Sequence, residues 1–139
     1  VNATFSDNSA TAGGSIYLNP NSNPEILNSI LYSNSKPEIY LSNGTTPNVI
    51  YSLVDGASNE SYFGEGCLDE DPLFKQIDEN NYRLKFINCG DDITSPAIDA
   101  GQPDSLDAVL DCGEGLGTAR ADMGYYGGRY SEMIVGVAN

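Results

Sequence analysis

Short apolar runs punctuate the first half of the chain and are separated by stretches rich in Asn, Ser, Gly and Pro. The runs are too short for helices, and their β-branched and aromatic members favour strands. The residues between them are those that tight turns prefer. The pattern therefore predicts a series of short strands joined by turns.

The runs recur at a fixed spacing. Residues 24–31 (PEILNSIL) align with residues 47–54 (PNVIYSLV), which stand 23 positions later. Residues 14–18 (GSIYL) align with residues 37–41 (PEIYL) at the same spacing. Self-similarity of this length indicates a solenoid, in which each repeat forms one coil of strands and stacks on the next.

The spacing changes near the start of the repeated region, and the repeat weakens near its end. Residues 2–8 align with residues 28–34 at a spacing of 26, which places three extra residues in the turn at residues 19–23. Turns absorb such insertions at little cost while strand lengths stay fixed. Residues 61–64 form a weaker third copy, one period beyond the second.

Equivalent residues of successive repeats should stack. We expect Ile26 and Val49 to lie about one strand spacing (~4.8 Å) apart, and Ile16 to lie over Ile39. Alternation along each strand then assigns one set of residues to the interior, and the opposite assignment would turn Ile30 inward with its counterpart Leu53. The favoured interior set is Ala3, Phe5, Leu27, Ser29, Leu31, Ile50, Ser52 and Val54.

Asn residues also recur at equivalent positions, with Asn2 matching Asn28 and Asn8 matching Asn34. Stacked Asn side chains can hydrogen-bond from coil to coil, and Asn tolerates the left-handed backbone of tight corners. The alternative is that Asn is simply common in turns.

The repeat breaks down after residue 63. Residues 82–86 alternate in polarity and predict an edge strand, and residues 95–101 predict a brief apolar turn, with one helical turn from Ser95 as an option. We therefore divide the chain into coils (1–63), degenerate last coils with an irregular C-terminal cap (64–130), and a tail or linker (131–139). A solenoid needs an atypical end to cover its last coil.

Several motifs in this order resemble the C-terminal part of secreted bacterial right-handed parallel β-helix proteins. The repeats read NATFSDNSA (2–10) and GGSIY (13–17). The final part carries DPLF (71–74), SPAIDAG (95–101) and GTARADMGY (117–125). The resemblance spans roughly residues 1–128. It implies an all-β, right-handed parallel β-helix, a solenoid of 23 residues per coil with an irregular C-terminal cap.

The resemblance also implies an extracellular or cell-surface location, because such regions often precede a surface-anchoring or secretion-sorting domain. The expected function is a non-catalytic structural or adhesive module, whose rows of Asn, Ser and Tyr can contact carbohydrate. The alternative is the C-terminal part of a polysaccharide-acting enzyme, a lyase or glycoside hydrolase, with its active site upstream. Function does not follow from fold.

The chain starts in what reads as the middle of a coil, so we expect its first strand to pair with upstream coils of a longer parent or with another copy. Repeated end-to-end contact would build a filament. The formal net charge of −14 opposes self-association and also disfavours nucleic acid as a partner. The apolar runs are too short for membrane insertion.

Three cysteines predict one disulfide and one remaining thiol. Cys89 and Cys112 each precede a Gly in the cap, and we favour this pair over either pairing with Cys67. With no His and no Cys-x-x-Cys motif, a structural zinc site is not expected.

Candidate catalytic groups are few, and no catalytic or cofactor-binding residue is assigned. Arg120 and Asp122 could act on an acidic sugar, but a buried structural pair is the simpler interpretation. The acidic groups at residues 69–71 and 91–92 could bind calcium, the only cofactor considered, although turn and solubility roles are favoured. We therefore expect no enzymatic activity from this chain.

Overall fold

The computed structural model describes residues 1–76, 81–108, 110–112 and 115–128, and within them the protein is all-β with short strands. No helix in these ranges is long and apolar enough to cross a membrane. The helical element there is the 3-10 turn η2 (Ile87–Cys89). The strands are β1 (Thr4–Ser6), β2 (Ile16–Leu18), β3 (Glu25–Leu27), β4 (Ile30–Tyr32), β5 (Ile39–Leu41), β6 (Asn48–Ile50), β7 (Leu53–Val54), β8 (Phe74–Gln76) and β9 (Asn81–Leu84).

Strands one repeat apart pair in parallel. The sheets have the orders β1-β4-β7, β2-β5 and β3-β6. Ile26 pairs with Val49 and Ile16 with Ile39, as the 23-residue spacing predicts. Thr4 pairs with Ile30, which confirms the spacing of 26 between the first two repeats. We call residues 1–68 the parallel unit.

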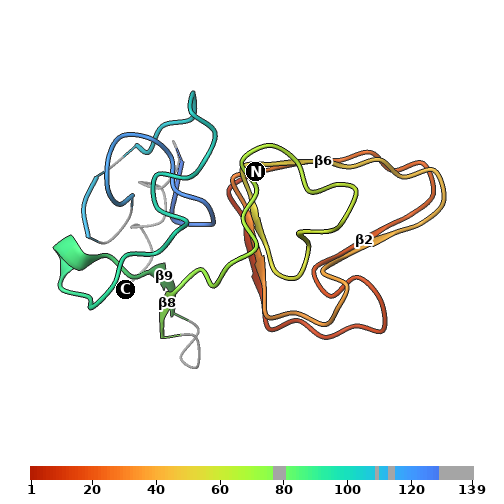
Figure 1. Ribbon diagram of the computed structural model, residues 1–139, viewed down its shortest axis with the longest axis horizontal. Coiled ribbons are helices and arrows are strands. Elements are labelled where there is room, and N and C mark those ends of the chain that lie inside the picture. Colours follow the sequence, from red (N-terminus) through yellow and green to blue (C-terminus); the bar gives the residue numbers. More distant parts are fainter. Residues whose placement is uncertain (77–80, 109, 113–114, 129–139) are drawn as a thin grey trace, which may run out of the picture.

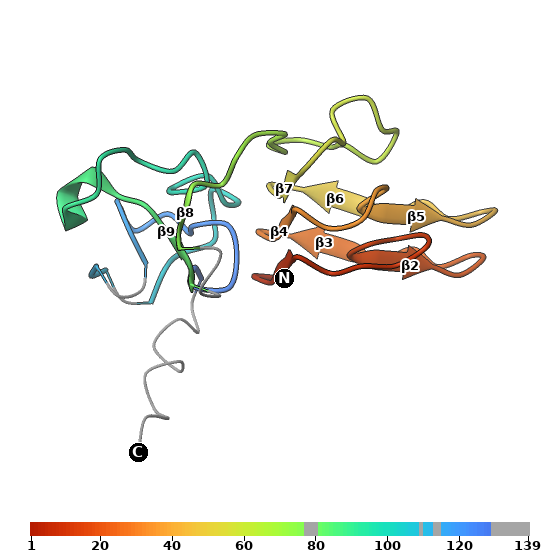
Figure 2. The same cartoon turned by 90° about the horizontal axis from the view of Figure 1, so that it is seen from below.

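An apolar core lies between the three sheets. Viewed along the stack they form the sides of a roughly triangular outline (Figure 1), and the side view shows β5 and β6 layered over β2 and β3 (Figure 2). Each strand contributes only one or two inward side chains, so the core is narrow. Its buried members are Leu18, Ile26, Leu31, Ile39, Val49, Val54, Ala57 and Tyr62.

The favoured interior assignment is correct for the residues that follow the corner at positions 28 and 51, and wrong for the residues that precede it. Leu31 and Val54 lie in the core, and Ser29 and Ser52 are buried, with the Ser29 amide donating to Ser52 Oγ at 3.1 Å. Leu27 is only half-buried, as is its counterpart at position 50, because their neighbours in β3 and β6 face inward instead.

The corner itself explains this error. Asn28 adopts φ 51°, and its counterpart Tyr51 adopts φ 47°. A left-handed residue interrupts the alternation of an extended chain, so inward positions do not continue with period two across it. Asn2 has the same φ of 51°, which fits the expected left-handed role of the Asn residues at this corner.

The third copy pairs differently from its predicted register. A 23-residue period would place Phe63 beside Tyr40, but Phe63 forms a parallel bridge with Val49. The chain between β7 and this bridge is too short to complete another full repeat. Instead, it folds over the end of the core, where Ala57 and Tyr62 are buried in the apolar cluster.

Residues 72–128 form a second body, the lateral unit, described with the gaps given above. Its hairpin pairs β8 with β9 antiparallel, in agreement with the predicted edge strand. It packs against the flank of the parallel unit (Figures 1 and 2). The expected cap would instead have covered the last coil. The apolar cluster between the units contains Ile30, Leu53, Phe74, Leu84, Ala97, Leu116 and Met123.

Backbone contacts complete this junction. The Gly124 amide donates to the Asn28 carbonyl at 2.8 Å, and the Tyr125 amide donates to Thr4 Oγ1 at 3.0 Å. Gly124 has φ 94°, and a Cβ there would lie 2.9 Å from the Ile30 side chain. Glycine is therefore required for this close approach.

Two local predictions have different outcomes. Residues 96–99 form a turn without a helix, and Ser95 Oγ accepts from the Ala97 amide at 3.1 Å. A short side chain that binds the backbone locally competes with helix formation. The predicted tail, residues 131–139, lies outside the described residues.

Candidate functional site

A pair of stacked tyrosines stands on the outer face of the β2–β5 sheet. Tyr17 and Tyr40 are equivalent residues, and their side chains point outward because their strand neighbours face the core. The ring centroids are 4.9 Å apart with an interplanar angle of 13°. Tyr17 is 54% exposed and Tyr40 37% exposed. The repeat therefore places two amphipathic rings together on the surface.

Stacking limits how these rings can meet a ligand. Each ring covers one face of the other, which leaves the outer faces of the pair and the hydroxyl edges accessible. Ser42 Oγ donates to the Tyr17 hydroxyl at 3.4 Å, so hydroxyl groups surround the edge. The pair offers an apolar face beside polar groups, which suits a sugar ring or another flat, partly polar ligand.

A groove of about 310 Å³ lies where the two units meet. The parallel unit contributes the end of β4, and the lateral unit contributes residues next to β8 and β9. Its lining residues are Tyr32, Ser33, Asp71, Leu73, Phe74 and Lys85.

The polar groups of the groove are only partly engaged by the protein. One oxygen of Asp71 accepts from the Leu73 amide at 2.8 Å, and Asp71 is also hydrogen-bonded to Tyr32. Burial raises the pKa of the Tyr32 hydroxyl, and the negative charges of Asp71 and Asp55 raise it further. Lys85 Nζ lies 3.4 Å from Asp92, a carboxylate that is itself exposed.

Aromatic rings line the same junction. Phe74 is buried and makes edge contacts with Tyr32, at a centroid distance of 6.2 Å, and with Tyr82, at 5.3 Å. The Tyr82 hydroxyl donates to Asp7 Oδ2 at 3.4 Å, while Ser33 Oγ donates to Asp7 Oδ1 at 3.0 Å. The groove lining thus combines ring surfaces with hydroxyl groups, the Asp71 carboxylate and one ammonium group, and Asp7 lies next to it through its bond from Ser33.

A buried polar network lies at another corner of the parallel unit. Asn8 Nδ2 donates to Asn34 Oδ1 at 2.9 Å, so the predicted stacking of these two Asn residues is confirmed. Asn34 Nδ2 also contacts Glu38 Oε2 at 2.9 Å, and Ser15 Oγ donates to the same oxygen. Lys36 Nζ lies 3.3 Å from Glu38 and 2.6 Å from Asp55. Because the polar groups of this network are paired with one another, we interpret the network as structural.

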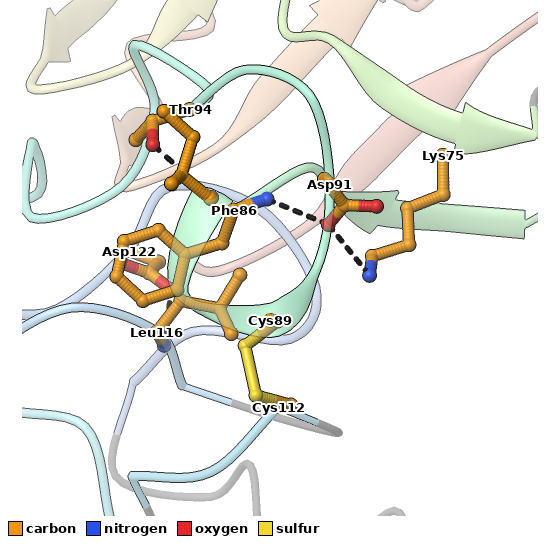
Figure 3. The surroundings of a disulfide bond; sticks show 9 residues. Lys75, Phe86, Cys89, Asp91, Thr94, Cys112, Leu116 and Asp122 are labelled. Atoms are coloured by element: carbon orange, nitrogen blue, oxygen red, sulfur yellow. Dashed lines mark hydrogen bonds and ion pairs between the residues drawn. A yellow bond between two sulfur atoms is a disulfide. The ribbon is translucent and has the colours of Figure 1, made fainter.

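One residue of each acidic group considered for calcium, Asp69 and Asp91, is bound by protein donors. Asp69 accepts from the Gly56 and Ser58 amides, at 2.7 and 3.0 Å. Asp91 accepts from the Phe86 amide at 2.8 Å and pairs with Lys75 at 2.7 Å (Figure 3). Within the described ranges, no group of three or more metal-ligating side chains is brought together.

The expected pairing of Arg120 with Asp122 is wrong. Arg120 Nε donates to the Gly101 carbonyl at 2.7 Å. Asp122 is buried and accepts from the Asp99 and Leu116 amides, both at 2.8 Å. The two side chains therefore bind separate backbone groups instead of each other.

A second buried carboxylate, Asp107, lies close to Asp122. The amides of Asp122 and Gly128 both donate to it. Burial raises the pKa of Asp107 to about 6 and that of Asp122 to about 7. Both carboxylates accept hydrogen bonds from backbone amides of the lateral unit. The sequence gave no indication of a role for Asp107.

Cys89 and Cys112 form a disulfide in the lateral unit, with Cα atoms 5.5 Å apart (Figure 3). This is the favoured pair, and it separates residues by 23 positions. Cys67 is a free thiol in the parallel unit, half-buried, and burial raises its pKa. A smaller hollow of about 170 Å³ lies beside the disulfide.

Sequence reasoning anticipated surface tyrosines but missed the groove. Its residues come from three distant segments that meet only because the lateral unit packs on the flank. Comparisons with protein-family models, with curated proteins and with solved structures found no match to this chain.

Proposed function

We propose that this chain is a non-catalytic structural or adhesive module of a secreted or cell-surface bacterial protein, built as a right-handed parallel β-helix. The motif resemblance and the parallel pairing at 23 and 26 residues support the fold. The disulfide fits an oxidising compartment such as the cell exterior.

The observation that carries the adhesive part is the stacked, exposed pair Tyr17 and Tyr40. Large aromatic side chains at the surface gain free energy when a flat ligand covers them. Their hydroxyl edges favour partners with many hydrogen-bonding groups, and the net charge of −14 disfavours polyanions. Carbohydrate of low negative charge satisfies both conditions.

The proposed partners also include upstream coils of a longer parent or a second copy. Strands β1, β2 and β3 are edge strands in their sheets, and no described strand pairs with their outer edges. Unpaired strand edges are templates for further pairing. Repetition of the contact would give end-to-end assembly.

Co-sedimentation with insoluble neutral polysaccharides tests the adhesive function. Replacing both Tyr17 and Tyr40 by Ala should weaken retention about threefold to tenfold, the range expected from aromatic contacts. Tyr125→Ala removes an exposed tyrosine from the lateral unit and serves as the matched control.

Unchanged retention of the double variant would refute the role of the tyrosine pair, and no retention of the unmodified protein would refute adhesion. The same incubations should release no reducing ends. Steady release of reducing ends would contradict a non-catalytic function.

A further inference from the structure

The groove between the units has the size of a small-ligand site. Its volume of about 310 Å³ falls at the lower end of the range for ligand pockets and is sufficient for one sugar residue. Two units contribute to it, and pockets occur preferentially at such boundaries. The groove lies apart from the outward face that carries the tyrosine pair, which belongs to the β2–β5 sheet.

One part of the groove is apolar. Phe74 is buried, and the ring of Tyr32 is fixed against it by an edge contact. The Leu73 side chain adds aliphatic surface and is held in place by an unusual backbone, φ 53°, which the Asp71 carboxylate stabilises through the Leu73 amide. These groups form a preformed surface for the C–H face of a ring.

The other part carries donors and acceptors in alternation. Asp71 is exposed and has acceptor capacity beyond its bonds to Leu73 and Tyr32. Lys85 supplies an ammonium group whose partner in the structure, Asp92, is exposed and therefore weakly held. Ser33 adds a hydroxyl. Neighbouring hydroxyl groups of one sugar ring require this mixture.

A metal ion would require a different arrangement. Carboxylates are dispersed here among hydroxyls and an ammonium group, whereas hard cations prefer several converging oxygen ligands. Among the described residues, no group of three or more His, Cys, Asp or Glu side chains could hold a metal ion. A hydroxyl-rich organic ligand is the better fit.

We propose that this groove binds a single neutral or amino-substituted sugar residue of a glycan and excludes acidic sugars. This inference rests on the proposed carbohydrate-binding function and names the ligand class. Asp71 lines the groove, Asp7 is bonded to the lining residue Ser33, and Asp92 is paired with Lys85, so the carboxylates around the groove outnumber its one ammonium group. A uronate carboxylate would meet net repulsion.

Titration with methyl glycosides of a hexose, a hexosamine and a uronic acid, followed by NMR of the aromatic rings, tests this proposal. Shifts of the Tyr32 and Phe74 signals should saturate with the hexose and the hexosamine at millimolar concentrations and be absent with the uronic acid. Asp71→Asn should weaken binding at least about tenfold, because a charged acceptor is lost. Asn at this position can still accept from the Leu73 amide, so the turn is kept.

Glu70→Gln provides the matched control, because it removes the same charge from the adjacent, exposed residue. It should leave the affinity within about twofold, and Lys85→Met should weaken hexose binding. Equal losses for Asp71→Asn and Glu70→Gln, preferential uronic acid binding, or no saturating sugar would overturn the proposal. If polysaccharide retention still depends on Tyr17 and Tyr40 in that case, only the groove proposal fails.

Discussion

Ile30 and Leu31 are adjacent on β4 and are buried in two different apolar clusters. Leu31 is 0% exposed and faces the core of the parallel unit, while Ile30 is 1% exposed and faces the lateral unit. Leu53 and Val54 repeat this division on β7. At β4 and β7, the β1-β4-β7 sheet is therefore buried on both faces. This explains why adjacent residues of these two strands are apolar.

This division predicts different consequences for two similar substitutions. Ile30→Ala and Leu31→Ala should each lower the free energy of unfolding by about 2–5 kcal/mol, since each leaves a cavity in a packed cluster. Ile30→Ala should also speed amide exchange in the lateral unit more than in β3 and β6, whereas Leu31→Ala should reverse that order. Leu106→Ala, at an exposed position, is the control. Identical exchange profiles for the two variants would contradict the separation of the clusters.

The buried acids predict that mild acid stabilises the protein. Burial raises the pKa of Asp107 to about 6 and of Asp122 to about 7, above the ordinary value of 3.8. The folded state therefore binds protons more tightly than the unfolded state, and this stabilisation is lost as pH rises through 6 to 7. The melting temperature should rise when pH falls from 8 to 5.

Other carboxyl groups act outside that window. Hydrogen bonds lower the pKa of Asp69 and Asp91 below 3.8, so their contribution is lost only under stronger acid. Asp122→Asn should reduce the slope between pH 5 and 8, and the exposed Asp104→Asn should not. A melting temperature that falls steadily from pH 8 to 5 would contradict the assignment.

The repeats were predictable because strands that pair at a fixed spacing carry similar residues at equivalent positions of the sequence. The pairing of Ile26 with Val49 follows directly from their equivalent places in the repeat. The position of the lateral unit on the flank was not predictable. The sequence does not distinguish the apolar side chains of β4 that face the core of the parallel unit from those that face the lateral unit. The groove could not be found for the same reason, because Tyr32, Asp71 and Lys85 meet only after that packing.

The disulfide should stabilise the lateral unit by closing a loop. For a separation of 23 residues, the lost entropy of the unfolded chain corresponds to about 3 kcal/mol. Replacing Cys89 and Cys112 together by Ala should lower the midpoint of denaturant unfolding accordingly. A reductant should destabilise the unmodified protein and leave the double variant unaffected. Peptide mapping without reduction should show Cys67 free, and a crosslink to Cys67 would contradict the pairing.

Asn34 should be essential to the polar corner. Its side chain donates to Glu38 and to the Phe5 carbonyl, and it accepts from Asn8. Asn34→Ala would leave the buried Glu38 carboxylate with fewer donors, and we expect a loss of about 2–4 kcal/mol in unfolding free energy. Ser9→Ala, at an exposed position of the equivalent turn in the first repeat, should change it by less than about 0.5 kcal/mol. Calorimetry of both variants measures these two changes in unfolding free energy. Equal losses would contradict an essential role for Asn34.

The outer edges of β1, β2 and β3 should support association between copies. These edges lack described partners, and pairing there would continue the sheets across the contact. The charge of −14 on each copy opposes the approach, so added salt should promote it by screening. Light scattering should therefore show a mass that grows with protein and salt concentration. Tyr17→Asp places a further negative charge on β2 and should suppress this growth, whereas Tyr125→Asp, on the lateral unit, should not. A constant monomer mass at high salt, together with slow amide exchange in β1 and β2, would mean that the edge is protected within the chain itself.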